Sequence, residues 1–180
     1  GGITTTGDDA DIKTESTGTI DANGGASNGS TGGAGGRVDI TTNDNGGVAD
    51  GSDIQILAAV NANGGQPGTA ATAGAGGNIF VNTDADVTAD VAGSGDSPLS
   101  TVIISADLLA NGADLRAGAT AGDGGAGGRV LVNTGGVTST ILVDNGAQIA
   151  ANGGNATGTA VAGGAGGDVD VVASIFQSRI

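Results

Sequence analysis

The sequence predicts an all-β fold, namely a right-handed parallel β-helix in which three short strands form each coil of about 40 residues. The first observation is a repeat: a glycine-rich run followed by an alternating apolar segment begins at Gly32, Ala73, Gly124 and Gly163. The second is composition, because 39 glycines accompany many Val, Ile, Ala and Thr residues but only 2 Phe and no Trp or Tyr. The third is the placement of Gly and Asn between the apolar segments, where a coil must bend.

Each repeat contains three apolar segments with the two-residue spacing of a β-strand. One follows the glycine run, as in "RVDI" at 37–40. Upstream of each run, an apolar residue and an alanine stand two positions apart, which places both on the inward face. These pairs are Ile20/Ala22, Val60/Ala62, Leu115/Ala117 and Ile149/Ala151. The remaining segments are 53–57, 101–105 and 140–143.

A stretch of variable length separates each of these alanines from the next glycine run. Variable length at one fixed place indicates a loop, so we expect glycine-rich loops to protrude from one edge of the stack. The glycines that bring each loop back to the stack are interpreted as structural corners. They are Gly35, Gly36, Gly76, Gly77, Gly127, Gly128, Gly166 and Gly167.

We expect a single β-solenoid domain over residues 1–180. Its repeats cover approximately 19–58, 59–112, 113–146 and 147–180, with a partial N-terminal coil at 1–18. A four-bladed propeller also has repeats of about 40–45 residues, but its blades need four strands and usually aromatic residues. Three segments per repeat therefore favour the β-helix.

The chain is acidic and has few side chains of the types that are common in catalytic sites. Its formal net charge is −14, from 19 acidic and 5 basic residues. We expect no nucleic-acid partner, because such binding needs clustered Lys and Arg, and no membrane insertion, because no apolar run approaches ~20 residues. The sequence has no His or Cys for the common nucleophile–base pairs, so we expect no enzyme. Strand alternation turns Phe80, one of the two aromatic residues, away from the face of Ile79 and Val81.

The glycine runs superficially match two ligand-binding motifs. A dinucleotide loop needs a following helix, whereas a strand follows here. In the calcium-binding nonapeptide G-G-x-G-x-D-x-U-x, the aspartate is a ligand of the ion. Only the last glycine run has an aspartate at this position, Asp168, whereas the other three runs have Arg37, Asn78 and Arg129. A regular calcium array is therefore rejected. No cofactor is required, and the acidic turns offer at most weak calcium sites. The candidate ligands there are Asp8, Asp9, Asp11, Asp44, Asp84 and Asp86.

The segment "GGAGGRVLVNTGGVTSTILVDNGAQIAANGG" is similar to the repeats of filamentous-haemagglutinin-like secreted proteins. In that family a "GGNITI" strand, an "SLTL" strand and an "NGAQISA" strand form one triangular coil. The corresponding positions here are 127–132, 140–143 and 145–151, and the resemblance covers most of 19–171. It implies export by a two-partner or autotransporter route and a role as a surface adhesin. The departures are the longer glycine-rich loops and the missing N-terminal secretion domain.

Both ends of a short solenoid expose strand edges and an apolar cross-section unless polar caps cover them. The sequence has no evident cap, and the residues expected at the assembly ends are Ile3, Ile175, Phe176 and Ile180. We therefore expect an extracellular structural protein: a segment of a longer solenoid, or a subunit that stacks end to end into a surface filament, sheath or adhesin. We expect its partners to be copies of itself, and surface glycans are a further candidate.

The alternatives are a carbohydrate-binding or carbohydrate-cleaving β-helix and an ice-binding solenoid. A sugar-binding face would be marked by a line of aromatic residues or a carboxylate–arginine cluster. An ice-binding face would be marked by threonines that recur at the coil period. None of these features is evident in the sequence.

Overall fold

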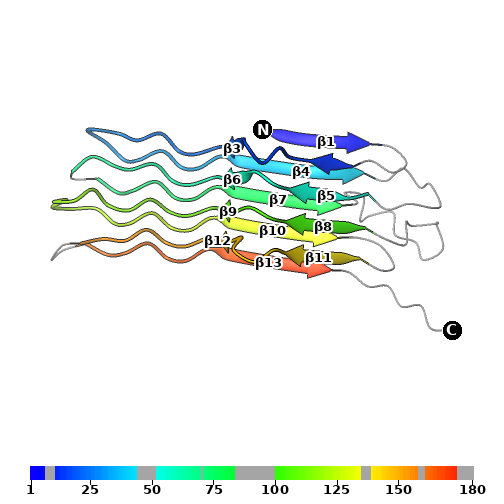
Figure 1. Ribbon diagram of the computed structural model, residues 1–180. Coiled ribbons are helices and arrows are strands. Elements are labelled where there is room, and N and C mark those ends of the chain that lie inside the picture. The colour runs from blue at the N-terminus through cyan, green and yellow to red at the C-terminus, as the bar shows by residue number, and fades with distance from the viewer. Residues whose placement is uncertain are drawn as a thin grey trace.

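A computed structural model shows a parallel β-solenoid in the part of the chain that it describes, residues 1–6, 11–43, 52–69, 71–83, 100–134, 139–157 and 161–173. The predicted all-β fold with three strands per coil is confirmed. Coils stack on one another, so that equivalent strands of successive repeats lie side by side (Figure 1). Within the described residues no helix is long and apolar enough to span a membrane.

Every strand pairs in parallel with its equivalent one coil away, and the strands form three sheets. Sheet A contains β1 (Gly2–Thr6), β4 (Arg37–Asn43), β7 (Asn78–Thr83), β10 (Arg129–Thr134) and β13 (Asp168–Ala173). Sheet B contains β2 (Ile12–Lys13), β5 (Ile54–Ile56), β8 (Thr101–Ile104) and β11 (Thr140–Val143). Sheet C contains β3 (Thr19–Asp21), β6 (Ala59–Asn61), β9 (Leu108–Leu109) and β12 (Ile149–Ala150).

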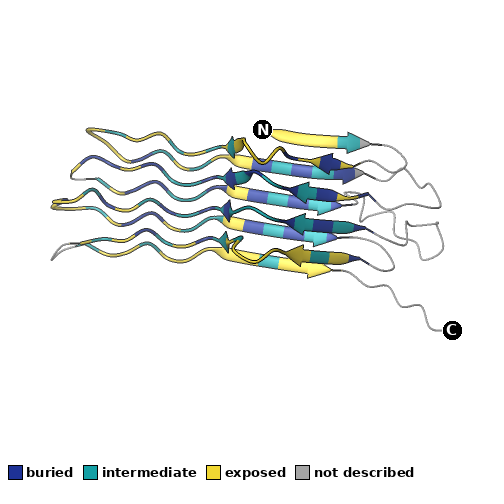
Figure 2. Cartoon of the chain, in the orientation of Figure 1, coloured by how far each residue is buried: buried dark blue, intermediate teal, exposed yellow. Residues whose placement is uncertain are grey.

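The core is built from columns of similar apolar side chains that follow the solenoid axis. In sheet A, Val38, Ile79 and Val130 share one register position and are buried. Ile40, Val81 and Val132 form the next inward column and are fully buried. Stiff β-branched side chains suit such columns, because the same shape recurs at every ~4.8 Å step between strands. Figure 2 shows this dark core in the middle coils and lighter, exposed strands at both ends of the stack.

One predicted segment is wrong. The sequence places the pair Leu115/Ala117 in sheet C, but the third strand of that sheet is β9, in which Leu108 pairs with Val60. The motif Asn111-Gly112 therefore follows its strand, as the other Asn-Gly-Gly motifs do, instead of preceding one. Leu115 lies outside the sheets and packs against Ala73 in a small separate apolar cluster.

After each strand of sheet C the chain leaves the solenoid, runs outward, and then returns to sheet A. The four extensions stack into one projection that we call the fin (Figure 1, left). Their described residues are 22–36, 62–69 with 71–77, 110–128, and 151–157 with 161–167. Each extension has an outgoing limb and a returning limb. The glycine-rich loops thus protrude from one edge of the stack, as the sequence predicts.

Candidate functional site

The limbs of the fin are extended chains whose hydrogen bonds recur every third residue. In the first returning limb, the N–H groups of Gly32 and Gly35 donate to the returning limb of the next coil, at 3.1 and 2.8 Å. The next residues along, Gly33 and Gly36, donate to the outgoing limb of their own coil, at 2.9 and 2.6 Å. A period of three with partners in other limbs is the pattern of polyproline II chains. The fin is therefore a bundle of such chains and not a fourth β-sheet.

Hydrogen bonds between limbs connect the fin from one end to the other. The N–H of Gly33 donates to Gly25 O at 2.9 Å, that of Gly65 to Gly33 O at 2.7 Å, and that of Gly74 to Gly65 O at 2.9 Å. The same zigzag continues through Ala113, Gly125, Gly154 and Gly164. Each coil adds two members to this series.

Close packing of backbones explains why the fin needs glycine. A Cβ at Gly76 would lie 2.1 Å from Ala110 O of the next coil. A carbon atom cannot approach an oxygen so closely, so only glycine fits, as at the crowded axis of a collagen triple helix. At Gly25 and Gly166, in the first and last coils, a Cβ would meet nothing within 4 Å. These two positions are open toward the two ends of the stack.

The eight glycines interpreted as structural corners lie in the returning limbs, just before sheet A. None of them has a positive φ angle, which among the described glycines occurs only at Gly118, Gly122 and Gly146. The limbs enter the sheet without a left-handed turn. The requirement for glycine at Gly35, Gly76 and Gly127 comes from a carbonyl oxygen of the next coil, 2.0–2.1 Å from the Cβ position.

An asparagine side chain joins each coil to the next where the fin begins. Asn23 Oδ1 accepts the N–H of Asn63 at 2.8 Å, and Asn63 Oδ1 accepts the N–H of Asn111 at 2.9 Å. Asn111 Oδ1 in turn accepts the N–H of Asn152 at 2.8 Å. The motif Ala-Asn-Gly thus has three roles: the alanine faces the core, the asparagine bonds along the stack, and the glycine enters the crowded fin.

Several carboxylates also accept hydrogen bonds from the next coil. Asp11 Oδ1 accepts the N–H of Asp53, and Asp53 Oδ1 accepts the N–H of Thr101, both at 2.9 Å. Asp21 accepts bonds from Asn61 Nδ2 at 2.7 Å and from Thr19 Oγ1 at 2.9 Å. The bond from Asn61 is the main reason why the pKa of Asp21 lies below its ordinary value. Part of the acidic composition therefore serves contacts between coils.

Of the six calcium candidates, only Asp11 belongs to the described residues, where it holds the backbone of Asp53. Asp8, Asp9, Asp44, Asp84 and Asp86 lie outside them. The described part of the chain has no group of three or more acidic residues placed to hold a metal ion.

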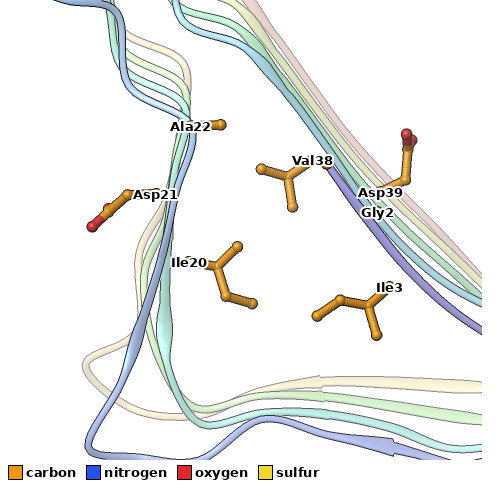
Figure 3. A pocket seen from close by; sticks show the side chains of 8 residues that line it. Gly2, Ile3, Ile20, Asp21, Ala22, Val38 and Asp39 are labelled. Atoms are coloured by element: carbon orange, nitrogen blue, oxygen red, sulfur yellow. The ribbon is translucent and has the colours of Figure 1, made fainter.

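The N-terminal end of the core is open. Ile3 of β1 is 41% exposed, and a pocket of about 250 Å³ lies between β1 and β3. Figure 3 shows Ile3, Ile20 and Val38 pointing into this space, while Asp21 and Asp39 point away from it. In the coils below, the space above each valine or isoleucine of this column is filled by the preceding coil. Here it is bounded by Gly1, which has no side chain to fill it.

The C-terminal end of the core is also open. Val169 and Val171 of β13 continue the inward columns of sheet A but are 43% and 47% exposed. Val143 ends an inward column of sheet B and is exposed as well. Of the four residues expected at the assembly ends, Ile3 is at the open N-terminal end. Ile175, Phe176 and Ile180 lie outside the described residues.

The outer face of sheet A gathers charged side chains around one aromatic ring. The guanidinium carbon of Arg37 lies 4.3 Å from the ring centre of Phe80, and that of Arg129 lies 6.0 Å from it. Arg37 forms an ion pair with Asp39 at 2.8 Å, and Arg129 forms one with Asp170 at 2.9 Å. We call these five residues the Phe80 cluster.

Sequence reasoning did not find this carboxylate–arginine cluster. The signal was in the repeat itself, because Arg37, Asn78 and Arg129 hold equivalent positions beside the ring's own column. Comparing outward positions of neighbouring repeats, and not only each repeat by itself, would have brought the five residues together.

Comparison of the chain with protein-family models, with curated proteins and with solved structures gives no match.

Proposed function

We propose that this chain is a structural module of an extracellular filament, sheath or adhesin, and that further β-solenoid coils join it end to end. The carrying observation is that the columns of the core are unfinished at both ends. Ile3 is exposed at one end, and Val169 and Val171 are exposed at the other. Apolar surface of this kind is characteristic of contact sites, and solenoids otherwise cover it with polar caps.

The fin supports the same proposal. Gly25 and Gly166 keep space free on the outer faces of the first and last coils, although no described residue would lie within 4 Å of a Cβ there. Their equivalents Gly65 and Gly127 are crowded by the neighbouring coil, with backbone oxygens 2.2 and 2.0 Å from the Cβ position. The position of Gly25 holds Ala113 in the third coil, so a methyl group is tolerated there. All three equivalents of Gly166 are glycines crowded by the next coil, and glycine at Gly166 therefore fits a fin that continues beyond the last coil.

The surface role agrees with the resemblance to filamentous-haemagglutinin-like repeats, and the charge suits an exported fibre. A formal charge of −14 keeps separate molecules soluble and opposes nonspecific aggregation. Ordered growth along the axis then depends on matched strand edges at the two ends.

Negative-stain electron microscopy and sedimentation velocity of the purified chain test the proposal. We expect rods of one width whose length grows with protein concentration and with salt, because salt screens the charge. Dispersed monomers at every concentration and salt level, with and without calcium, would overturn end-to-end assembly. Rods that form only with calcium would support assembly and would also make calcium part of it.

The Phe80 cluster favours a second candidate function, the binding of carbohydrate. Half-exposed Phe80 offers an apolar ring, and the ion-paired Arg37 and Arg129 offer donors beside it. A glycan array probed with the wild-type chain and with Phe80→Ala tests this function, and Thr41→Ala on the same face is the control. Binding lost only in Phe80→Ala would support it, whereas binding to no glycan, or equal binding by all three chains, would overturn it.

No described outer face favours ice binding. The longest column of threonines in sheet A is Thr5, Thr42, Thr83 and Thr134, and it faces inward, with the last three fully buried. Outward threonines recur only in pairs among the described strands, Thr4 with Thr41 and Thr101 with Thr140.

A further inference from the structure

We infer that β1 is a placeholder strand, which β13 of a second copy replaces when two copies join. This inference rests on the proposed function and specifies its contact. Within the described residues, sheet A has five strands, whereas sheets B and C have four each. Two rigid copies of this described part therefore cannot continue all three sheets at once.

The extra strand of sheet A creates a conflict at one position of the junction, where β1 of one copy and β13 of the other would overlap. If β2 of a second copy follows β11 of the first, and β3 follows β12, the sheets B and C and the fin continue without a gap. The position of β1 in the second copy is then already filled by β13 of the first. If β1 stays in place instead, sheets B and C each lack one strand at the junction. Continuity of the stack thus requires that β1 leave and that β13 pair with β4.

The side chains favour this exchange. β1 offers Gly1 and Ile3 to the inward columns of sheet A, and Gly1 leaves the pocket of about 250 Å³ over Val38. β13 offers Val169 and Val171 at the same two positions. Val169 would enter the pocket and continue the column of Val38, so that both exposed valines become buried. Apolar burial therefore favours β13 over β1.

The same register places charges at the junction. Asp170 of one copy would stand directly opposite Asp39 of the other, and Asp168 would stand opposite Arg37, because these residues share columns of sheet A. Facing carboxylates repel, while the Asp168–Arg37 pair attracts. These two pairs oppose each other, but each copy also carries a formal net charge of −14, so repulsion prevails between copies. The exchange should therefore be slow at low salt and faster as salt screens the repulsion. β1 thereby delays assembly, and exchange of one strand for another gives a contact that can repeat without closing.

A designed disulfide tests the release of β1. A Cβ at Gly2 would lie 3.6 Å from Asp39 Cβ, which is within the range of disulfide bonds, and the chain has no cysteine of its own. The variant G2C/D39C, when oxidised, ties β1 to β4. We expect the oxidised form to stay monomeric at a salt concentration at which its reduced form assembles.

A second variant tests the new pairing directly. In D39C/D170C the two cysteines are far apart in one chain but face each other across the junction of two copies. Mild oxidation should give a ladder of dimers, trimers and longer chains on a non-reducing gel. The control T41C/D170C shifts one cysteine by two positions, where the distance of about 7–8 Å is too long for a disulfide. It should give little or no ladder.

A third variant leaves β1 free but improves its fit. Gly1→Val has open space at its Cβ and would fill the pocket from within the chain. We expect it to slow assembly severalfold. Gly2→Val adds the same side chain on the outward face and should slow assembly less.

The outcomes separate the inference from the proposed function. The ladder from D39C/D170C together with the block in oxidised G2C/D39C supports strand exchange. Wild-type rods that form while the locked variant assembles equally well, and without a D39C/D170C ladder, overturn the exchange but leave end-to-end assembly standing. Monomers throughout, in the wild type and in all reduced variants, overturn both.

Discussion

The side-chain Oδ1 of Asn63 lies 2.9 Å from the backbone nitrogen of Asn111, one coil further along the solenoid. This bond satisfies a half-buried N–H group at the place where the chain leaves sheet C and enters the fin. The bond is one step in a series that runs from Asn23 to Asn152, so each interior asparagine connects two coils.

We expect Asn63→Ala to lower the free energy of unfolding by about 1–3 kcal/mol, because it leaves the N–H of Asn111 without an acceptor. Asn152→Ala is the matched control, since its side chain accepts no hydrogen bond from the described residues. The control should change stability by less than about 0.5 kcal/mol. Urea unfolding followed by circular dichroism measures both variants, and equal losses would contradict the role of the series.

The fin offers a second matched pair. Gly76→Ala forces a Cβ to within 2.1 Å of Ala110 O, whereas Gly166→Ala meets nothing within 4 Å. We expect Gly76→Ala to cost about 1–3 kcal/mol or more, since two backbones must separate to admit the methyl group. Gly166→Ala should be neutral or slightly stabilising in the monomer, because alanine restricts the unfolded chain. Unfolding of dilute monomers checks both values, and a large loss in Gly166→Ala would show that the outer face is covered.

The solenoid could be predicted from the sequence, but the packing of its fin could not. The reason is that the solenoid follows from patterns within short segments, whereas the fin depends on contacts between coils. The columns of Val38 and Ile40 follow from alternation within one short segment, which can be read along the chain. The need for glycine at Gly76 arises from Ala110 O, and the contact of Arg37 with Phe80 arises from strand register one coil away. Such contacts depend on how repeats align, and the glycine-rich loops of unequal length hide that alignment. The misplacement of Leu115 in sheet C has the same origin.

Acid should weaken one contact between coils in a defined pH range. Hydrogen bonds from Asn61, Thr19 and Asn23 hold the pKa of Asp21 below its ordinary value of 3.8. A carboxylate with a lowered folded-state pKa adds stability that is complete above the unfolded-state pKa. That stability is lost as the pH falls through the folded-state pKa. We therefore expect the stability difference between wild type and Asp21→Asn to be constant at neutral pH and to disappear below pH 3.8.

The titration of Asp21 can also be followed directly. The side-chain carboxyl carbon, observed by NMR in the folded chain, should titrate below 3.8. A midpoint at or above that value would contradict the hydrogen bonds that the structure assigns to this carboxylate.

The Phe80 cluster predicts a measurable coupling between two side chains. The Arg37 guanidinium carbon is 4.3 Å from the ring centre of Phe80, against 6.0 Å for Arg129. A double-mutant cycle of Arg37→Ala and Phe80→Ala should give a coupling of about 0.5–1 kcal/mol, which is usual for an exposed cation–π pair. The same cycle with Arg129→Ala should give a smaller coupling. Equal couplings would contradict the closer approach of Arg37 to the ring, and couplings near zero for both would mean that the arginines act only through their ion pairs with Asp39 and Asp170.

Two buried threonines should respond in opposite ways to the same substitution. Thr14 Oγ1 accepts the N–H groups of Leu57 and Ala58, at 2.8 and 2.9 Å. Thr83 is fully buried, and its Oγ1 has no hydrogen-bond partner in the described part of the chain. Valine keeps the branched shape of threonine but removes the hydroxyl group. Thr14→Val should therefore cost about 1–3 kcal/mol, because two backbone donors lose their acceptor.

Thr83→Val should instead leave stability unchanged or raise it, because a buried hydroxyl without a partner disfavours the folded state. The gain should be at most about 1 kcal/mol, since the hydroxyl is only one small group. Guanidinium unfolding of both variants measures the contrast under one set of conditions. A loss of more than about 1 kcal/mol in Thr83→Val would mean that its hydroxyl is hydrogen-bonded in solution. The inward column of Thr42, Thr83 and Thr134 would then be a polar seam that stabilises the stack.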